Sequence, residues 1–419
     1  MTKVVQHRAA NDSAAHHDPV VVAAAKAAAR ARKRDDSSEA YLYTVWEPNE
    51  GAALEASLEV DPETGMAPIR LVDARFLVNL SKADGMLVRR QDLPEEAFIN
   101  LKTLKFMSKG YMKTDLRILC LSYPWLTPYH PDPRGDSLKL LAAALDVFCR
   151  DRFDGGAWAV FIDYCSLPQL GPRGEPRTPA EAALLERGLS SLASLFSHPC
   201  TWTLKLTQLP ADFPAAFEFP PGVRANAAAY DERGWCWTEA SVSNLVKPYT
   251  QVLDLSRFTG SARLLPDVIR ECRAGRAPPL TPSAFNAILE SKAFTWKDAD
   301  LPRVRALYKA AFEGRFARAA KLSYIDLGWG DADVEALCGV IEEGALRHTA
   351  SLSLVGNQLS DAGMRVLAAS LGRDGVAPEL QTLELSCNAA GDAACAEVLA
   401  SLRSAQLRER DGDGAAALT

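Results

Sequence analysis

The stretch Trp158-Ala-Val-Phe-Ile-Asp163-Tyr-Cys165-Ser166-Leu-Pro168-Gln169 decides how the chain folds. Its first half is a short apolar run, which is typical of a strand buried on both faces of a parallel sheet. Its second half turns polar and reaches Pro168, which a central strand does not tolerate. We therefore predict a buried strand that presents Asp163, Cys165 and Ser166 at its carboxyl end, where open α/β sheets build their sites. Taken alone, Asp163 is explained equally well as the cap of a turn.

Bulk composition excludes several classes of protein. A chain of 419 residues has room for two or three domains, and its net charge of −6 argues against nucleic acid as the main partner. The nine cysteines are scattered without any C-x-x-C pair, which favours a reducing compartment and predicts neither a disulfide framework nor a metal site. No apolar run reaches the roughly 20 residues of a membrane helix, and the start lacks a secretory signal. We expect a cytoplasmic protein, with the nucleus as the alternative.

Changes in composition along the chain predict its organisation. The expected segments are a disordered tail at 1–39, an N-terminal subdomain at 40–113, an α/β domain at 114–275, a helical linker at 276–320, a repeat segment at 321–407 and a disordered tail at 408–419. Within the N-terminal subdomain, we expect short strands near 69–72 and 75–80, and a helix that begins at Asp92. The basic stretch at 30–34 is similar to a nuclear-import patch, but a solvated tail also explains it.

Strand and helix patterns alternate through the α/β domain. Four apolar runs predict strands at 116–123, 158–163, 201–206 and 251–255. Helical patterns follow them, beginning at Asp136, covering 179–197, opening near Trp235 and covering 264–273. This alternation predicts a mostly parallel sheet that is flanked by helices.

Four short motifs in this domain occur in an order that is known from one family. They are Leu121-Ser122-Tyr123-Pro-Trp125, the stretch from Trp158 to Gln169, Glu186 before a leucine stripe, and Arg233-x-Trp235-x-x-x-Glu239. Together they resemble the motifs of fungal heterokaryon-incompatibility (HET) domains, and their order is similar to that of the Toll/interleukin-receptor (TIR) fold. The resemblance covers roughly 130 residues and implies a TIR/HET-like α/β fold.

The resemblance also implies a reaction, the cleavage of NAD between nicotinamide and ribose. Catalytic TIR domains use one glutamate for it, which corresponds to Glu239 here. Nicotinamide leaves as a neutral molecule, so one carboxylate that stabilises the oxocarbenium-like charge suffices. The residues expected around the substrate are Ser122, Tyr123, Trp125, Asp163, Cys165 and Trp235. NAD is then a substrate, no cofactor or metal is expected, and assembly into a homo-oligomer is implied.

Other interpretations remain open at this stage. Glu239 is also suited to pair with Arg233 near a helix start, with the tryptophans as core residues. The α/β domain would then be a non-catalytic, self-associating part of an interaction scaffold, or a nucleotide-binding domain that does not cleave its ligand. Cys165 is better explained as a packed thiol than as a nucleophile paired with His198. The chain has no G-x-S-x-G elbow or phosphate-binding glycine loop after a strand.

A leucine pattern repeats in the last quarter of the chain. Its units are Leu322-x-x-Ile325-x-Leu327, Leu352-Ser-Leu354-x-x-Asn357 and Leu380-x-x-Leu383-x-Leu385-x-x-Asn388, about 30 residues apart. Helical patterns follow at 334–343, 361–371 and 392–402. The units resemble leucine-rich repeats of the ribonuclease-inhibitor type and predict a short α/β solenoid. Its concave surface, with Asp326, Ser353 and Glu384, either binds a protein partner or packs against the α/β domain. The whole chain is then an intracellular signalling or defence-type protein.

Overall fold

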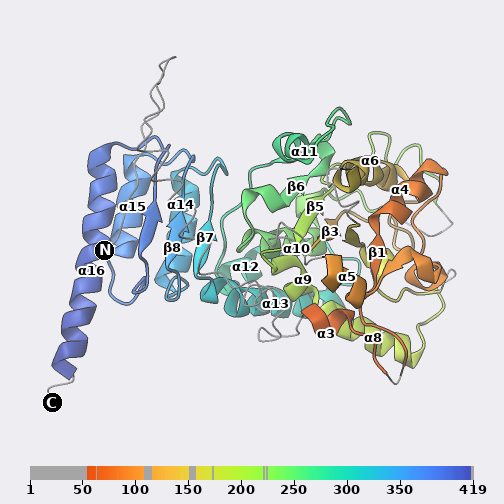
Figure 1. Ribbon diagram of the computed structural model, residues 1–419, viewed down its shortest axis with the longest axis horizontal. Helices are drawn as coiled ribbons and strands as arrows, with labels where there is room; N and C mark the ends of the chain where they lie inside the picture. The colour runs from red at the N-terminus through yellow and green to blue at the C-terminus, as the bar shows by residue number, and fades with distance from the viewer. Residues whose placement is uncertain are drawn as a thin grey trace.

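The computed structural model describes residues 54–62, 64–107, 116–150, 157–171, 174–219, 222 and 225–416. The expected tail at 1–39 and its basic stretch lie outside these residues. The described chain is mixed α/β, with a larger, mostly parallel sheet flanked by helices and a smaller sheet beside it (Figure 1).

The larger sheet has the strand order β2-β1-β4-β3-β5-β6. Its strands are β1 (Leu71–Asp73), β2 (Phe98–Ile99), β3 (Ile118–Ser122), β4 (Ala159–Phe161), β5 (Trp202–Lys205) and β6 (Val252–Asp254). The four strands predicted in the α/β domain are all present and run parallel to one another, which confirms that prediction. β1 joins β4 in the antiparallel direction and carries β2 on its outer side. The carboxyl ends of β3, β4, β5 and β6 therefore lie along one edge of the sheet.

Helices cover both faces of this sheet. One face carries α4 (Ala74–Lys82), α6 (Asp136–Arg150) and α11 (Leu265–Cys272), and the other carries α9 (Leu192–Ser197) and α10 (Gly234–Asn244). Side chains of β3 alternate between the two cores, since Leu119 and Leu121 pack on the α6 side and Cys120 packs on the other. Ser122 lies two residues after Cys120 in the same strand and therefore points to the α10 side as well.

Three local predictions are wrong. Residues 75–80 form the helix α4 rather than a strand, because Asp73 ends β1 and its side chain accepts a hydrogen bond from the Arg75 backbone N–H at 2.8 Å. Asp92 does not begin an α-helix, since its carboxylate binds Arg89 and the chain makes only short 3₁₀ turns before β2. The helix expected at 179–197 is two helices, α8 (Pro179–Ser190) and α9, which meet at Ser191.

The smaller sheet consists of β7 (Lys321–Ser323), β8 (Ser351–Ser353) and β9 (Thr382–Glu384), all parallel. Each strand is followed by a helix, α14 (Asp331–Glu342), α15 (Asp361–Leu371) and α16 (Asp392–Ala416), as the repeating pattern predicts. Asn357 joins two units, because its Oδ1 accepts hydrogen bonds from the N–H groups of Leu327 and Trp329. The last helix continues to Ala416, so helix replaces the tail expected after residue 408.

The repeat segment packs against the α/β domain. Between them lie α12 (Pro282–Leu289) and α13 (Lys297–Gly314), in the region where a helical linker is predicted. One continuous buried core runs from α9 and α10 through α13 into β7 and α14. The Tyr324 hydroxyl donates to the Leu245 carbonyl at 2.6 Å, just after α10 ends. Of the residues expected on the concave surface, Asp326 pairs with Arg273 and Ser353 is buried.

Candidate functional site

Polar side chains line the carboxyl edge of the larger sheet on the side of α10. Ser122 on β3 is the register partner of Lys205 on β5, which is in turn the partner of Asp254 on β6. Paired residues of parallel strands point to the same face. Thr203, two residues before Lys205, bonds to Ser243 of α10, so this face is the one that α10 covers. Asp163 follows β4 at the same edge.

Glu239 of α10 reaches this edge. The Ser122 hydroxyl donates to Glu239 Oε2 at 2.5 Å, and the Ser122 oxygen lies 2.7 Å from the hydroxyl of Tyr230. Ser122 has one proton and directs it to Glu239, so Tyr230 is the donor to Ser122. Both residues are buried, at 0% and 2% exposure, so bulk water does not reach either hydroxyl. The result is a chain of hydrogen bonds that ends on the carboxyl group of Glu239.

Asp163 is held by the first motif of the chain. Its Oδ1 accepts from the Tyr123 hydroxyl at 3.1 Å, and its Oδ2 accepts from Trp125 Nε1 at 2.8 Å. The backbone N–H of Tyr164 adds a third donor at 2.6 Å. Tyr123 is buried, whereas Trp125 keeps part of its surface exposed. Trp125 is therefore the ring of this motif that a ligand can contact.

The two carboxyl groups influence each other. Burial raises the pKa of Glu239 to about 8, a shift that the Ser122 hydrogen bond opposes and the charge of Asp163 reinforces. Burial also raises the pKa of Asp163 to about 6, against the hydrogen bonds from Tyr164, Trp125 and Tyr123. At pH 7, Asp163 is thus mostly ionised and Glu239 mostly protonated. Both residues retain some exposed surface, so a ligand can reach them. Perturbed carboxyl groups at a sheet edge are a common mark of a functional site.

Arg233 does not pair with Glu239. Its guanidinium group donates to the carbonyl oxygens of Ala228, Trp125 and Asn226. Arg233 therefore ties the segment before α10 to the segment after β3. The pairing of Glu239 with Arg233, considered from the sequence, is absent from the structure.

The structure brings together five of the seven expected site residues. They are Glu239, Ser122, Tyr123, Trp125 and Asp163. Cys165 is instead buried at 1% exposure in the core that α6 covers, and burial raises the pKa of its thiol. Trp235 packs toward α13 and hydrogen-bonds to the carboxylate of Asp300. These two side chains thus have other partners.

Sequence reasoning missed Tyr230, Cys236 and Lys205. Tyr230 and Cys236 pack together with Ala240 in a small buried cluster beside Glu239. A tyrosine that lies upstream of an Arg-x-Trp motif gives no sequence signal, because its role depends on how the preceding loop folds back. Lys205 could have been found, since it ends the apolar run of β5 as Ser122 ends that of β3.

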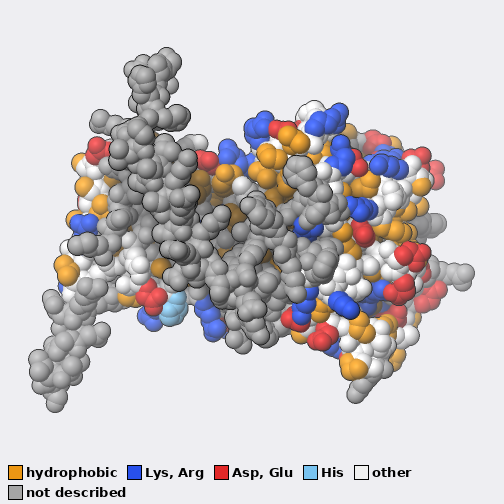
Figure 2. Space-filling model, in the orientation of Figure 1, with side chains coloured by type: hydrophobic (Ala, Val, Ile, Leu, Met, Phe, Trp, Pro, Cys, Tyr) orange, Lys and Arg blue, Asp and Glu red, His pale blue; other side chains and the backbone are white. Residues whose placement is uncertain are grey.

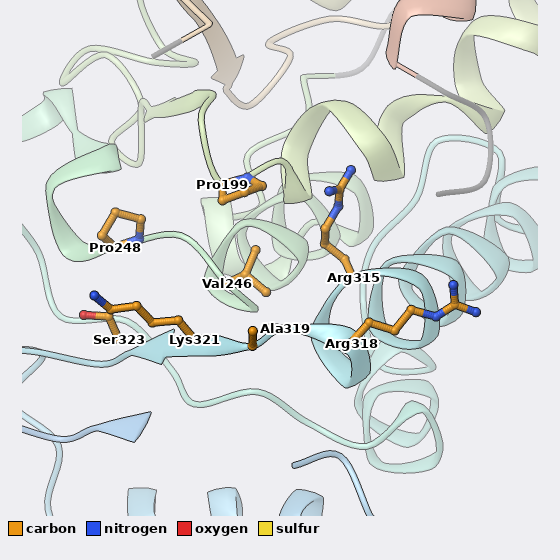
Figure 3. Close-up of a pocket in the computed structure, with 9 residues that line it drawn as sticks. Pro199, Val246, Pro248, Arg315, Arg318, Ala319, Lys321 and Ser323 are labelled. Atoms are coloured by element: carbon orange, nitrogen blue, oxygen red, sulfur yellow. The ribbon is translucent and has the colours of Figure 1, made fainter. Parts of the chain in front are cut away.

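A hollow of about 520 Å³ lies elsewhere, between the end of α10 and β7 (Figure 3). Its lining includes Val246, Arg315, Arg318 and Lys321 but none of the carboxyl groups described above. Figure 3 shows the three basic side chains pointing in different directions, so they do not converge on a single position.

The described surface and helices add little that is specific. On the face shown in Figure 2, Lys and Arg side chains lie beside Asp and Glu side chains over much of the α/β half. None of the described helices is long and apolar enough to span a bilayer. The described residues include no group of three or more His, Cys, Asp or Glu side chains placed to hold a metal ion.

Comparison of the chain with models of protein families, with curated proteins and with solved structures finds no match to any of them.

Proposed function

We propose that the α/β domain is a HET/TIR-like domain that hydrolyses NAD to nicotinamide and ADP-ribose, with Glu239 as the catalytic carboxylate. One observation carries the proposal: Glu239 of α10 bonds to Ser122 at the end of β3 and is electrostatically coupled to Asp163 at the end of β4. These residues come from three motifs that are far apart in the sequence. Their meeting at one edge of a parallel sheet is what a ligand site in such a fold requires.

The chemistry suits a carboxyl group with a high pKa. The nicotinamide ring of NAD is cationic, so its arrival beside Glu239 favours the ionised carboxylate. The bond between the ribose carbon and the ring nitrogen breaks, and its electron pair stays on neutral nicotinamide. The Glu239 carboxylate stabilises the positive charge left on the ribose, and a water molecule then attacks that carbon and loses a proton. Asp163 adds negative charge nearby, and Trp125 offers a ring face for stacking.

We further propose that the repeat segment is a short leucine-rich-repeat solenoid that regulates the α/β domain within a signalling or defence-type protein. Support comes from the parallel order of β7, β8 and β9 and from the hydrogen bonds that Asn357 and Asn388 make between units. Partner binding at the concave surface and self-association of the α/β domain belong to the same proposal.

Incubation of the purified protein with NAD tests the activity. We expect release of nicotinamide by the wild type and at least about a 100-fold loss in Glu239→Gln, because a charge-stabilising group is removed while the shape is kept. Glu335→Gln, at an exposed position on α14, is the matched control and should retain full activity.

The outcomes separate the candidate functions. Absence of nicotinamide release from folded wild type, including concentrated and assembled samples, would rule out hydrolysis. NAD binding without release would then favour a domain that reads a nucleotide. Absence of binding as well would favour a non-catalytic scaffold.

A further inference from the structure

Lys205 is a cation beside the candidate site that has no hydrogen bond or ion pair within the described part of the chain. It ends β5, one strand away from Ser122 and on the same face of the sheet. Adjacent strands lie about 4.8 Å apart, so its backbone is a short step from the Ser122–Glu239 hydrogen bond. Its side chain is partly buried, and with the described residues it forms neither a hydrogen bond nor an ion pair. Burial lowers the pKa of Lys205, which means that the protein does little to stabilise its charge.

Arg276 is a second buried cation within electrostatic range of Lys205. It is 7% exposed, and its three guanidinium nitrogens are buried without a hydrogen-bond partner among the described residues. Burial lowers the pKa of Arg276 to about 10. The charge of Arg276 also lowers the pKa of Lys205, so the two cations are close enough to repel each other. Buried charges without a counter-charge are strongly unfavourable. A bound anion would therefore stabilise these two cations.

Two carboxylates compensate the positive charge of Lys205 only in part. Asp254 and Asp231 lie within electrostatic range of Lys205 and raise its pKa, but neither forms an ion pair with it. The carboxylate of Asp254 already accepts hydrogen bonds from Thr207 Oγ1 and the Ser256 N–H, at 2.8 and 3.1 Å. The three donors of the Lys205 ammonium group therefore stay available.

We propose that Lys205, supported by the field of Arg276, binds a phosphate group of a nucleotide whose ribose lies at Glu239. The position of the ribose rests on the proposed function, whereas the anion site rests on the unpaired cations. Lysine is well suited to phosphate because it acts as a compact point charge with several donors. The carboxyl groups of Asp163 after β4 and Glu239 on α10 place negative charge at one part of the sheet edge. Lys205 at the end of β5 places positive charge at the neighbouring part. NAD has the matching polarity, with a cationic ring and an anionic diphosphate joined through one ribose.

The experiment measures binding by calorimetry at fixed ionic strength. The probes are ADP-ribose, nicotinamide mononucleotide, inorganic pyrophosphate and nicotinamide riboside, which lacks phosphate. We expect Lys205→Gln to weaken ADP-ribose and nicotinamide mononucleotide binding about tenfold or more and to leave nicotinamide riboside unchanged. Lys205→Arg keeps the charge and should retain most of the affinity. Lys139→Gln, on an exposed part of α6, removes the same charge elsewhere and should change nothing.

Each outcome bears on the anion site. Equal affinity of ADP-ribose for wild type and folded Lys205→Gln would overturn the proposal, as would equal losses for the riboside and the mononucleotide. Should Lys205→Gln not fold, wild type still decides, because binding of nicotinamide riboside as tight as that of the mononucleotide would leave phosphate without a role. Pyrophosphate alone distinguishes a general anion site from one that needs the nucleoside. ADP-ribose binding through Lys205 without nicotinamide release would keep the anion site and reject hydrolysis. Nicotinamide release by Lys205→Gln with an unchanged KM for NAD would support hydrolysis and reject the anion site.

Discussion

Glu239 combines partial burial, one hydroxyl donor and a neighbouring carboxylate, and its protonation controls the proposed reaction. Its pKa of about 8 lies above the pKa of an ordinary glutamate, so the group takes up protons as the pH falls below about 8. Only the ionised form stabilises a developing cation. We therefore expect kcat/KM for NAD to rise with pH and to level off above about 8, as the free enzyme titrates. A rate that stays flat between pH 6 and 9, or falls, would show that Glu239 is not the group that acts.

The hydrogen bond of Tyr230 reaches Glu239 through Ser122. Tyr230→Phe removes the donor to Ser122, which frees the serine hydroxyl to rotate away, so we expect the pKa of Glu239 to rise further. The same change should cost about 1 kcal/mol of stability because one buried hydrogen bond is lost. The measurement is a carbon-13 NMR titration of labelled glutamate, with Glu239→Gln to assign the signal.

Tyr308→Phe is the matched control for this variant. The hydroxyl of Tyr308 is also buried, donates to the Leu280 carbonyl and accepts from the Leu280 N–H, so its loss should cost at least as much stability and leave Glu239 untouched. In a Ser122→Ala background, Tyr230→Phe should no longer move the pKa. A shift of equal size in that background would mean that Tyr230 does not act through Ser122.

Some strands and helices could be predicted from local patterns in the sequence, and others could not. Long apolar runs with clear ends predicted β3, β4, β5 and β6, because strands buried on both faces leave no room for polar residues. The segment at 75–80 misled because its closely spaced apolar residues suit either a strand or a helix. What decided the outcome was Asp73, whose side chain caps the helix, and that single contact outweighs a short pattern.

Asn357 provides a test of how the repeat elements are joined. Its side chain accepts from two backbone N–H groups and donates to the carbonyls of Tyr324 and Leu354, and it is 5% exposed. Asn357→Ala leaves these backbone groups unsatisfied, so we expect a loss of about 3 kcal/mol in the free energy of unfolding. Chemical denaturation measures it.

Gln358→Ala, at an exposed side chain next to Asn357, is the control for that loss and should stay within about 0.5 kcal/mol of wild type. A small effect of Asn357→Ala, comparable to that of the control, would contradict the role assigned to the amide.

For the molecule as a whole, the sequence predicted the order of strands and helices better than the contacts between their side chains. The parallel sheet, the repeating strand–helix units and the meeting of Ser122, Asp163 and Glu239 could be predicted, because parallel strands bring their carboxyl ends to one edge. The displacement of Cys165 and Trp235 could not, since it depends on which core each side chain enters. The sequence left open whether the repeats pack against the α/β domain through a continuous core, because packing between distant segments leaves no periodic pattern in either one.

The helix that carries Glu239 is anchored at both ends by segments from outside its own sheet. At its start, the Gly234 N–H donates to the Ala293 carbonyl, and the ring of Phe294 lies so close that a β-carbon at Gly234 would clash with it. Just beyond its end, the Leu245 carbonyl accepts from Tyr324, which immediately follows the first repeat strand. Any displacement of that strand therefore strains the far end of α10. A protein that engages the repeats would thus be mechanically coupled to the carboxyl group of Glu239 without contacting it.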